Sequence, residues 1–67
     1  MNIRENQIYS AILNYTTAKG YPPSVRELGT LVGLKSSSTV HLYLHRIKLA
    51  GYIDFEPNQA RTLRVVK

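Results

Sequence analysis

The apolar positions of the first twenty residues recur with helical spacing. Four of them stand at i, i+3, i+4 and i+7 and therefore share one stripe of a helix: Ile8, Ala11, Ile12 and Tyr15. Asn2, with Glu5 three residues on, is typical of a capping box, in which two side chains satisfy unpaired backbone N–H groups. Gly20 favours the left-handed backbone that ends a helix. The pattern predicts a first helix between Asn2 and Gly20.

A second, shorter helix follows an extended segment. The stretch "YPPS" is predicted to be extended, because a residue before proline is pushed out of the helical region. Ser24 and Glu27 then repeat the capping box, and Gly33 marks the end. The apolar residues between them point inward at helical spacing: Val25, Leu28 and Val32.

The third predicted helix lies in "KSSSTVHLYLHRIKLAG", with Ser36 as its cap and Ala50 as its last residue before Gly51. At about 100° per residue, one face holds core residues: Val40, Tyr43, Leu44 and Ile47. The outer face holds a different set: Ser38, His41, Leu42, His45 and Leu49. A short helix, a tight turn with glycine and a longer helix form the outline of a helix-turn-helix.

The last part of the chain predicts two short strands. "GYIDF" and "RTLRVVK" are rich in strand-forming residues, and the polar "EPNQA" between them, with Pro57 and Asn58, suits a turn. The order is three helices followed by a β-hairpin. We therefore predict a mostly α member of the α+β class, with residues 1–67 forming one domain.

Length and composition exclude several classes of protein. With 67 residues the chain forms one small core, and without cysteine it has neither a disulfide framework nor a thiolate metal site. No apolar run approaches the ~18 residues of a membrane span, and the N-terminus lacks the order of a signal peptide. We expect a cytoplasmic protein that needs no cofactor and no membrane.

The charge is positive and unevenly placed. The net charge is +5, and residues 1–34 carry three basic and two acidic side chains, whereas residues 35–67 carry six basic and two acidic ones. The positive half of the chain is also the half with the outer face of the third helix. This distribution suits an anionic partner, either a nucleic acid or an acidic membrane surface, and it equally suits a soluble surface that is simply basic.

The outer face of the third helix suits a DNA major groove. It has no acidic residue, and its hydroxyls and imidazoles are short enough to let the helix approach base edges and donate or accept hydrogen bonds there. Leu42 could lie against a thymine methyl group. A capping role accounts for Ser36 taken alone. It does not account for the outward set taken together: Ser38, Thr39, His41 and Leu42.

Three segments of the chain resemble the DNA-binding domain of the LexA family of SOS-response repressors, in its Gram-positive form: "GYPPSVREL", "VGLKSSSTVH" and "AGYI" before a polar hairpin. The resemblance implies a winged helix-turn-helix, with the third helix in the major groove and the hairpin, the wing, on the DNA backbone. It also implies a palindromic operator with GAAC-type half-sites, bound by two copies of the domain.

Residue roles follow from the resemblance by position. Base reading is expected of Ser36, Ser38, Thr39 and His41, to which we add Leu42. Backbone contacts are implied for Lys35 and Arg61, and we extend them to His45, Arg46 and Arg64. Leu42 and Tyr43 replace the small residue and histidine common in those relatives. The peptidase domain of the family is absent from these 67 residues, so we expect no enzymatic activity and a monomer in the absence of DNA.

The same residues admit other interpretations. His41 and His45 have metal-ligand spacing, but no third histidine or cysteine accompanies them. The serines beside His41 could suggest a nucleophile and base, but adjacent serines at a helix start are usually caps. The main alternative is a winged helix that docks on another protein, for which the outward pair Leu42 and Leu49 is the best support.

Overall fold

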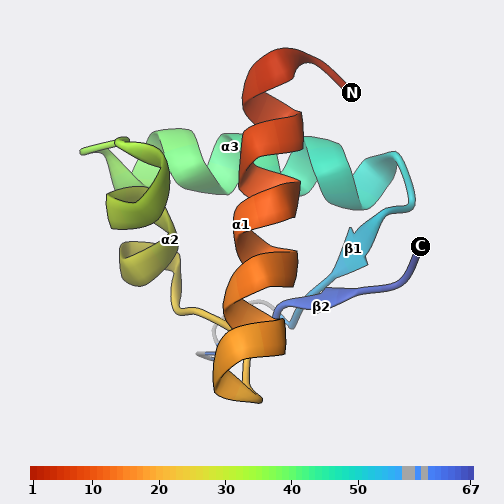
Figure 1. The fold of residues 1–67 in the computed structure, drawn as a ribbon. Coiled ribbons are helices and arrows are strands. Elements are labelled where there is room, and N and C mark those ends of the chain that lie inside the picture. The colour runs from red at the N-terminus through yellow and green to blue at the C-terminus, as the bar shows by residue number, and fades with distance from the viewer. Residues whose placement is uncertain (57–58, 60) are drawn as a thin grey trace.

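The computed structural model describes residues 1–56, 59 and 61–67. Three helices are followed by two strands in the predicted order: α1 (Ile3–Lys19), α2 (Val25–Val32), α3 (Ser37–Leu49), β1 (Ile53–Asp54) and β2 (Arg64–Val65). In Figure 1, α1 stands upright across α3, with α2 on one side and the strands on the other. The mostly helical winged helix-turn-helix architecture is thus confirmed. None of the described helices is long and apolar enough to cross a membrane.

Both predicted capping boxes are present. The Glu5 N–H donates to Asn2 Oδ1 at 2.8 Å, and the Asn2 N–H donates to Glu5 Oε1 at 3.1 Å. Ser24 and Glu27 make the equivalent pair at the start of α2, at 3.1 and 2.9 Å. Gly20 ends α1 with a φ of 83°. These contacts are local, which is why the sequence alone located the two helix starts.

The third helix also begins at its predicted cap. Ser36 Oγ accepts a hydrogen bond from the Thr39 N–H at 3.4 Å. The helix ends at Leu49, one residue earlier than predicted, because Ala50 is its C-cap. The chain then reverses through Gly51, whose φ of 86° is left-handed.

The turn between α2 and α3 depends on a close approach at Gly29. The Leu34 N–H donates to the Gly29 carbonyl at 2.8 Å. A Cβ on Gly29 would lie 3.0 Å from the Leu34 carbonyl oxygen and 3.3 Å from Val40 Cγ2. The missing side chain therefore lets the first turn of α3 pack directly on α2. This glycine inside a helix carries the helix-turn-helix geometry.

The core joins all three helices to the hairpin. Six of the predicted core residues of the helices are buried: Ile8, Ile12, Leu28, Val40, Leu44 and Ile47. Four more are half-buried and pack against this core: Ala11, Val25, Val32 and Tyr43. Ile53, Phe55 and Leu63 of the hairpin complete the core, which the sequence pattern had not assigned. Tyr15, predicted on the core stripe, is half-buried and instead packs edge-on against Tyr21, with ring centroids 5.9 Å apart.

The two strands are much shorter than predicted. They pair antiparallel with Ile53 opposite Val65 and Asp54 opposite Arg64. Beyond this pair, the Phe55 N–H donates to Asp54 Oδ1, and the Glu56 N–H donates to Thr62 Oγ1. The Thr62 side chain thus takes the Glu56 backbone donor that would have extended the ladder. The predicted turn residues Pro57 and Asn58 lie outside the described part of the chain.

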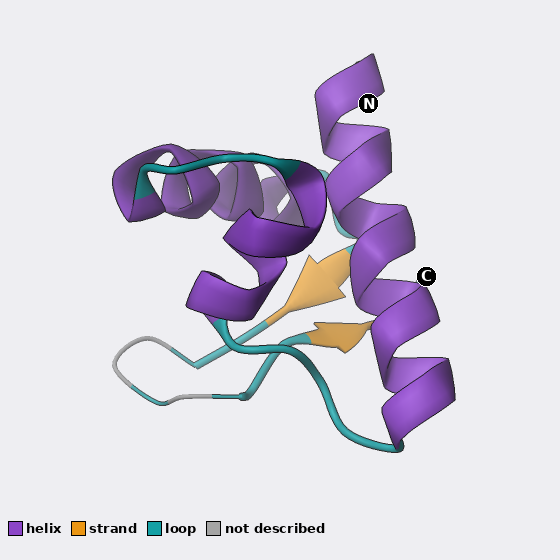
Figure 2. Cartoon of the chain, turned by 60° about the vertical axis from the view of Figure 1, so that its left-hand side comes forward, coloured by secondary structure: helices purple, strands orange, loops and turns teal. Residues whose placement is uncertain are grey.

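The hairpin packs on two helices. Strand β1 contacts α3, and β2 contacts α1 (Figure 2). We call the described residues from β1 to β2 the wing: residues 53–56, 59 and 61–65. Its place beside α3 brings the wing and the outer face of α3 into one surface.

Candidate nucleic-acid interface

The outer face of α3 is exposed as predicted. Ser38, His41 and His45 are exposed, and the side chains of Leu42 and Leu49 are 57% and 88% exposed. The neighbouring Ser37 is exposed too, and it was not among the predicted site residues. Thr39 is half-buried. The face therefore presents short polar and apolar side chains with no acidic group.

The N-terminal end of α3 leaves backbone donors available to an anion. Its first turn has no acidic residue, and Lys35 next to the cap is exposed. Helix N-termini attract phosphate, since their N–H groups are unpaired and the helix dipole is positive there. Ser36 Oγ occupies one of these donors, that of Thr39.

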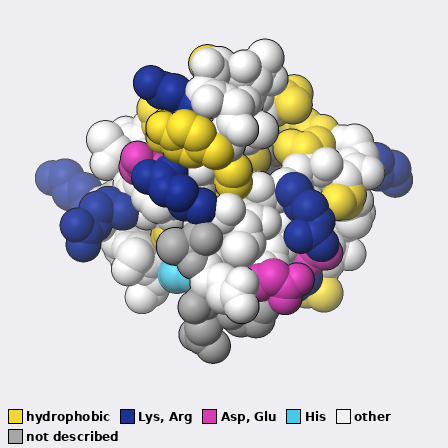
Figure 3. Space-filling view, turned by 90° about the horizontal axis from the view of Figure 1, so that it is seen from below, with side chains coloured by type: hydrophobic (Ala, Val, Ile, Leu, Met, Phe, Trp, Pro, Cys, Tyr) yellow, Lys and Arg dark blue, Asp and Glu magenta, His cyan; other side chains and the backbone are white. Residues whose placement is uncertain are grey.

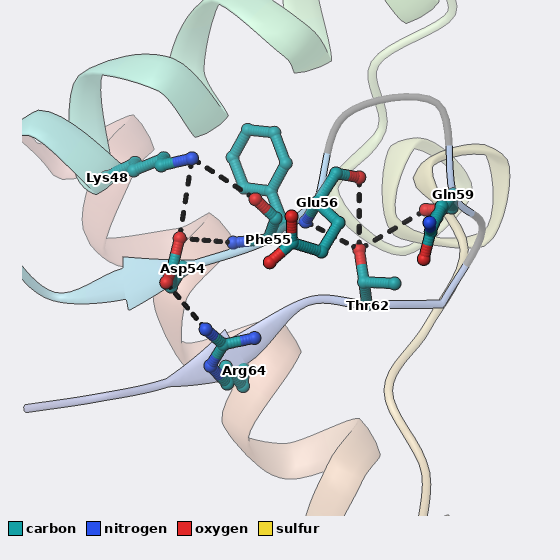
Figure 4. A network of polar contacts seen from close by, with 7 residues as sticks. All are labelled: Lys48, Asp54, Phe55, Glu56, Gln59, Thr62 and Arg64. Carbon is teal, nitrogen blue, oxygen red and sulfur yellow. Dashed lines mark hydrogen bonds and ion pairs between the residues drawn. The ribbon is translucent and has the colours of Figure 1, made fainter.

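The wing is braced by one threonine. Thr62 Oγ1 accepts from the Glu56 N–H at 2.9 Å and lies within donating distance of the carbonyls of Glu56 and Gln59, at 3.3 and 3.2 Å. Figure 4 shows these contacts crossing from one side of the wing to the other. A single side chain thereby closes the wing where the strand pairing has ended.

The base of the wing carries a cluster of charges around Asp54. Arg64 reaches this carboxylate at 2.6 Å and Lys48 of α3 at 3.3 Å, from opposite sides in Figure 4. Lys48 also donates to the Phe55 carbonyl at 3.1 Å. The Phe55 N–H and then the Lys48 ammonium lower the pKa of Asp54 below its usual value. Lys48 thus ties α3 to the wing, a role that the sequence pattern did not indicate.

The predicted backbone-contact residues differ in their surroundings. Arg61 pairs with Glu27 at 2.8 Å, Arg64 with Asp54, and Arg46 with Glu5 at 3.9 Å. The His45 ring lies edge-on to Phe55, with centroids 5.4 Å apart. In Figure 3, Lys and Arg side chains are spread over the face in view, with Asp or Glu beside some of them. Three of the five residues predicted to contact the DNA backbone, namely Arg46, Arg61 and Arg64, are therefore already paired with carboxylates of this chain.

A surface groove of about 460 Å³ lies between the outer part of α3, the wing and the start of α2. His41 and His45 line it on the side of α3, and Glu56, Gln59 and Thr62 on the side of the wing. Apolar residues also line it: Pro23, Val25, Leu44, Phe55 and Leu63. The groove joins the outer face of α3 to the wing in one continuous concave surface.

The metal interpretation gains no support from the geometry. Among the residues that the structure describes, no group of three or more His, Cys, Asp or Glu side chains could hold a metal ion. His41 and His45 lie on the outer face of α3 and line the groove.

The sequence matches known proteins over nearly its whole length. Residues 2–62 match the family described as the LexA DNA binding domain. The LexA repressor of Desulforamulus reducens is 47% identical over 66 residues, which are 98% of this chain and 31% of that protein. The LexA repressor of Clostridium kluyveri is 48% identical, over 98% of this chain and 33% of its own.

The LexA repressor of Staphylococcus aureus is 49% identical over 63 residues, or 94% of this chain and 30% of that protein. The chain thus spans about a third of the length of these relatives. The family match over residues 2–62 and these relatives show that this chain belongs to the LexA DNA-binding domain family.

Proposed function

We propose that residues 1–67 form a domain that binds double-stranded DNA at a specific sequence and serves in transcriptional repression, without enzymatic activity of its own. The observation that carries this proposal is the outer face of α3. It is exposed, has no acidic residue and follows the turn of a helix-turn-helix. The names of the LexA repressors that the chain matches support the same conclusion.

In this proposal α3 enters the major groove. Its 13 residues make a rod about 20 Å long, and its short outward side chains let it approach the floor of a groove about 12 Å wide. Ser38 and His41 offer donors and acceptors to base edges, and Leu42 offers apolar contact to a thymine methyl group. Ser36 and Thr39 stand at the helix start, where base edges and the nearest phosphate are both within reach.

Backbone contacts orient the domain in the same proposal. Lys35 and the N-terminal N–H groups of α3 bind one phosphate. His45 and Arg46 face the phosphates of the other DNA strand. The wing lies along the DNA backbone beside the major groove. Phosphate contacts set affinity and register, whereas base contacts set sequence preference.

The partner we propose is a palindromic operator occupied by two copies of the domain. Two-fold symmetry in the site mirrors two-fold symmetry in the bound pair. The operator sequence is obtained most directly by selecting bound duplexes from a random DNA pool, followed by footprinting. We expect one enriched palindrome and a protected region centred on it; a pool that stays random after selection would contradict sequence-specific binding.

The exposure of Leu42 and Leu49 favours a second candidate, a surface that docks on a protein. The dependence of binding affinity on salt concentration distinguishes the two candidates. Binding to DNA weakens steeply as salt rises, with a slope of about 0.9 per neutralised phosphate on logarithmic axes. An apolar protein interface would be nearly insensitive to the same change.

A further inference from the structure

Arg61 is held by an unusually complete set of contacts for an exposed side chain. Its guanidinium meets both carboxylate oxygens of Glu27, at 2.8 Å through Nη1 and 3.1 Å through Nη2. Nη1 also donates to the Pro22 carbonyl at 3.1 Å. The guanidinium carbon lies 5.2 Å from the centre of the Tyr21 ring. We call these contacts the Arg61 clamp.

The partners in the clamp are themselves fixed. Glu27 lies in the first turn of α2, where Oε1 also accepts the Ser24 N–H at 2.9 Å. Tyr21 packs edge-on against Tyr15 of α1. The clamp therefore attaches the wing to the start of α2 and to the loop that follows α1.

The backbone conformation of Arg61 is one that a residue with a side chain rarely adopts. Its φ of 59° lies in the left-handed region, where glycine is the residue expected. A glycine would adopt this backbone without strain but would supply no guanidinium. The contacts of the side chain account for an arginine in a position that suits glycine.

A phosphate would have to replace contacts that Arg61 already makes. The bidentate geometry with a carboxylate is the same geometry with which arginine binds phosphate. Glu27 thus occupies the fork of the guanidinium and neutralises its charge. Lys35 has no such carboxylate among its described contacts.

We propose that Arg61 is a positioning residue, which fixes the wing against α2 and so determines where the wing meets DNA, in place of the phosphate contact expected from the sequence. This inference rests on the proposed DNA-binding function. It makes the pair Arg61 and Glu27 the joint through which α2 and the wing move as one body on the DNA.

The two roles of Arg61 predict opposite effects of Glu27→Gln. Glutamine keeps the capping box at the start of α2, but it removes the charge partner of Arg61. If Arg61 positions the wing, Glu27→Gln weakens binding to the selected operator by about tenfold, the size of a typical coupling between contacting residues. If Arg61 binds phosphate, the same change frees the guanidinium and tightens binding. Glu56→Gln, on the wing, makes the matching charge change and serves as the control.

Arg61→Gln and the double variant complete the test in titrations at several salt concentrations. We expect Arg61→Gln to weaken operator binding as Glu27→Gln does, and the double variant to be no weaker than either. The salt slope should stay at the wild-type value, whereas loss of a phosphate contact would lower it by about 0.9. A lowered slope, additive losses, or Glu27→Gln binding as tightly as the Glu56→Gln control would overturn the inference.

Amide hydrogen exchange without DNA tests the joint separately from the proposed function. We expect the amide of residue 56, whose N–H donates to Thr62 Oγ1, to exchange faster in Glu27→Gln and Arg61→Gln than in the wild type and in Glu56→Gln. Unchanged exchange would overturn the clamp even if the chain binds DNA. A wild-type chain that binds no DNA would sink the proposed function, while the exchange data would still decide whether Arg61 holds the wing.

Discussion

At the scale of the single residue, His41 distinguishes base reading from general affinity. Its side chain is exposed on α3 and lines the groove toward the wing. We predict that His41→Ala costs about 1–3 kcal/mol on the selected operator and little on random DNA, because a base contact carries sequence information. Fluorescence anisotropy with both duplexes measures the two affinities.

Lys35→Ala is the control for this experiment. It should weaken both duplexes similarly and lower the salt slope by about 0.9, as expected for one lost phosphate contact. Equal losses on operator and random DNA for His41→Ala would show that this histidine does not read bases.

Glu27 gives a prediction about acid stability. The Ser24 N–H, followed by the Arg61 guanidinium, lowers the pKa of Glu27 from 4.5 to about 2. A carboxyl group with a lowered pKa in the folded state stabilises the fold fully above its unfolded pKa and loses this effect as pH falls through the folded value. We therefore expect the denaturant midpoint to fall as pH drops from about 4.5 to about 2.

Glu27→Gln tests the assignment of this pH dependence. The variant should show a shallower fall over the same pH range, measured by urea unfolding followed by circular dichroism. Part of the fall should remain, since the pKa of Asp54 is lowered as well. A pH profile identical to that of the wild type would contradict the Glu27 assignment.

At the scale of the element, Gly29 fixes how α3 sits on α2. Alanine inside a helix normally stabilises it by up to about 1 kcal/mol relative to glycine. Here the new Cβ would lie 3.0 Å from a backbone oxygen, so overpacking should reverse the sign. We predict that Gly29→Ala destabilises the chain by about 1–3 kcal/mol and weakens operator binding by shifting α3.

Thr30→Ala is the matched change one residue further along α2. Thr30 is exposed, and the described hydrogen bond of its hydroxyl runs to the Arg26 carbonyl of the same helix. The unfolding free energy of the Thr30→Ala variant should stay within about 0.5 kcal/mol of the wild-type value. A Gly29→Ala variant as stable as this control would mean that the α2–α3 contact is looser than the geometry indicates.

At the scale of the whole molecule, the chain offers little surface for a stable dimer. A standard interface buries about 800 Å² per partner, roughly a fifth of the 4419 Å² that this chain exposes. Two of its most exposed apolar side chains, Leu42 and Leu49, lie on the face proposed to meet DNA. We therefore expect a monomer at micromolar concentration in sedimentation velocity.

Linking two copies of the domain should compensate for the weak DNA binding of a single copy. Fusion to a dimerising coiled coil should tighten binding to the palindrome by about 10²-fold or more, since the second contact becomes intramolecular. Fusion to a monomeric helix of similar length is the control. A tight dimer of the unfused chain without DNA would contradict this account.

The sequence by itself determined the features that depend on neighbours within a turn or two of helix. The capping boxes at Asn2 and Ser24, the cap at Ser36 and the exposed face of α3 all follow from spacings of a few residues. Such contacts form whenever the helix forms, so the pattern contains them directly. The roles of Ser36, Ser38, Thr39, His41 and Leu42 on DNA stay predictions.

Only the tertiary structure decided which charges are already engaged and where the wing lies. Arg61 meets Glu27 across 34 positions of sequence, and Lys48 reaches Asp54 through the packing of α3 on β1. The short strands likewise reflect side chains that take backbone donors, such as Thr62 at Glu56. A pattern along the chain marks these residues as charged or polar, but their partners depend on how distant segments fold together, and that is settled by the core that joins Ile53, Phe55 and Leu63 to the helices.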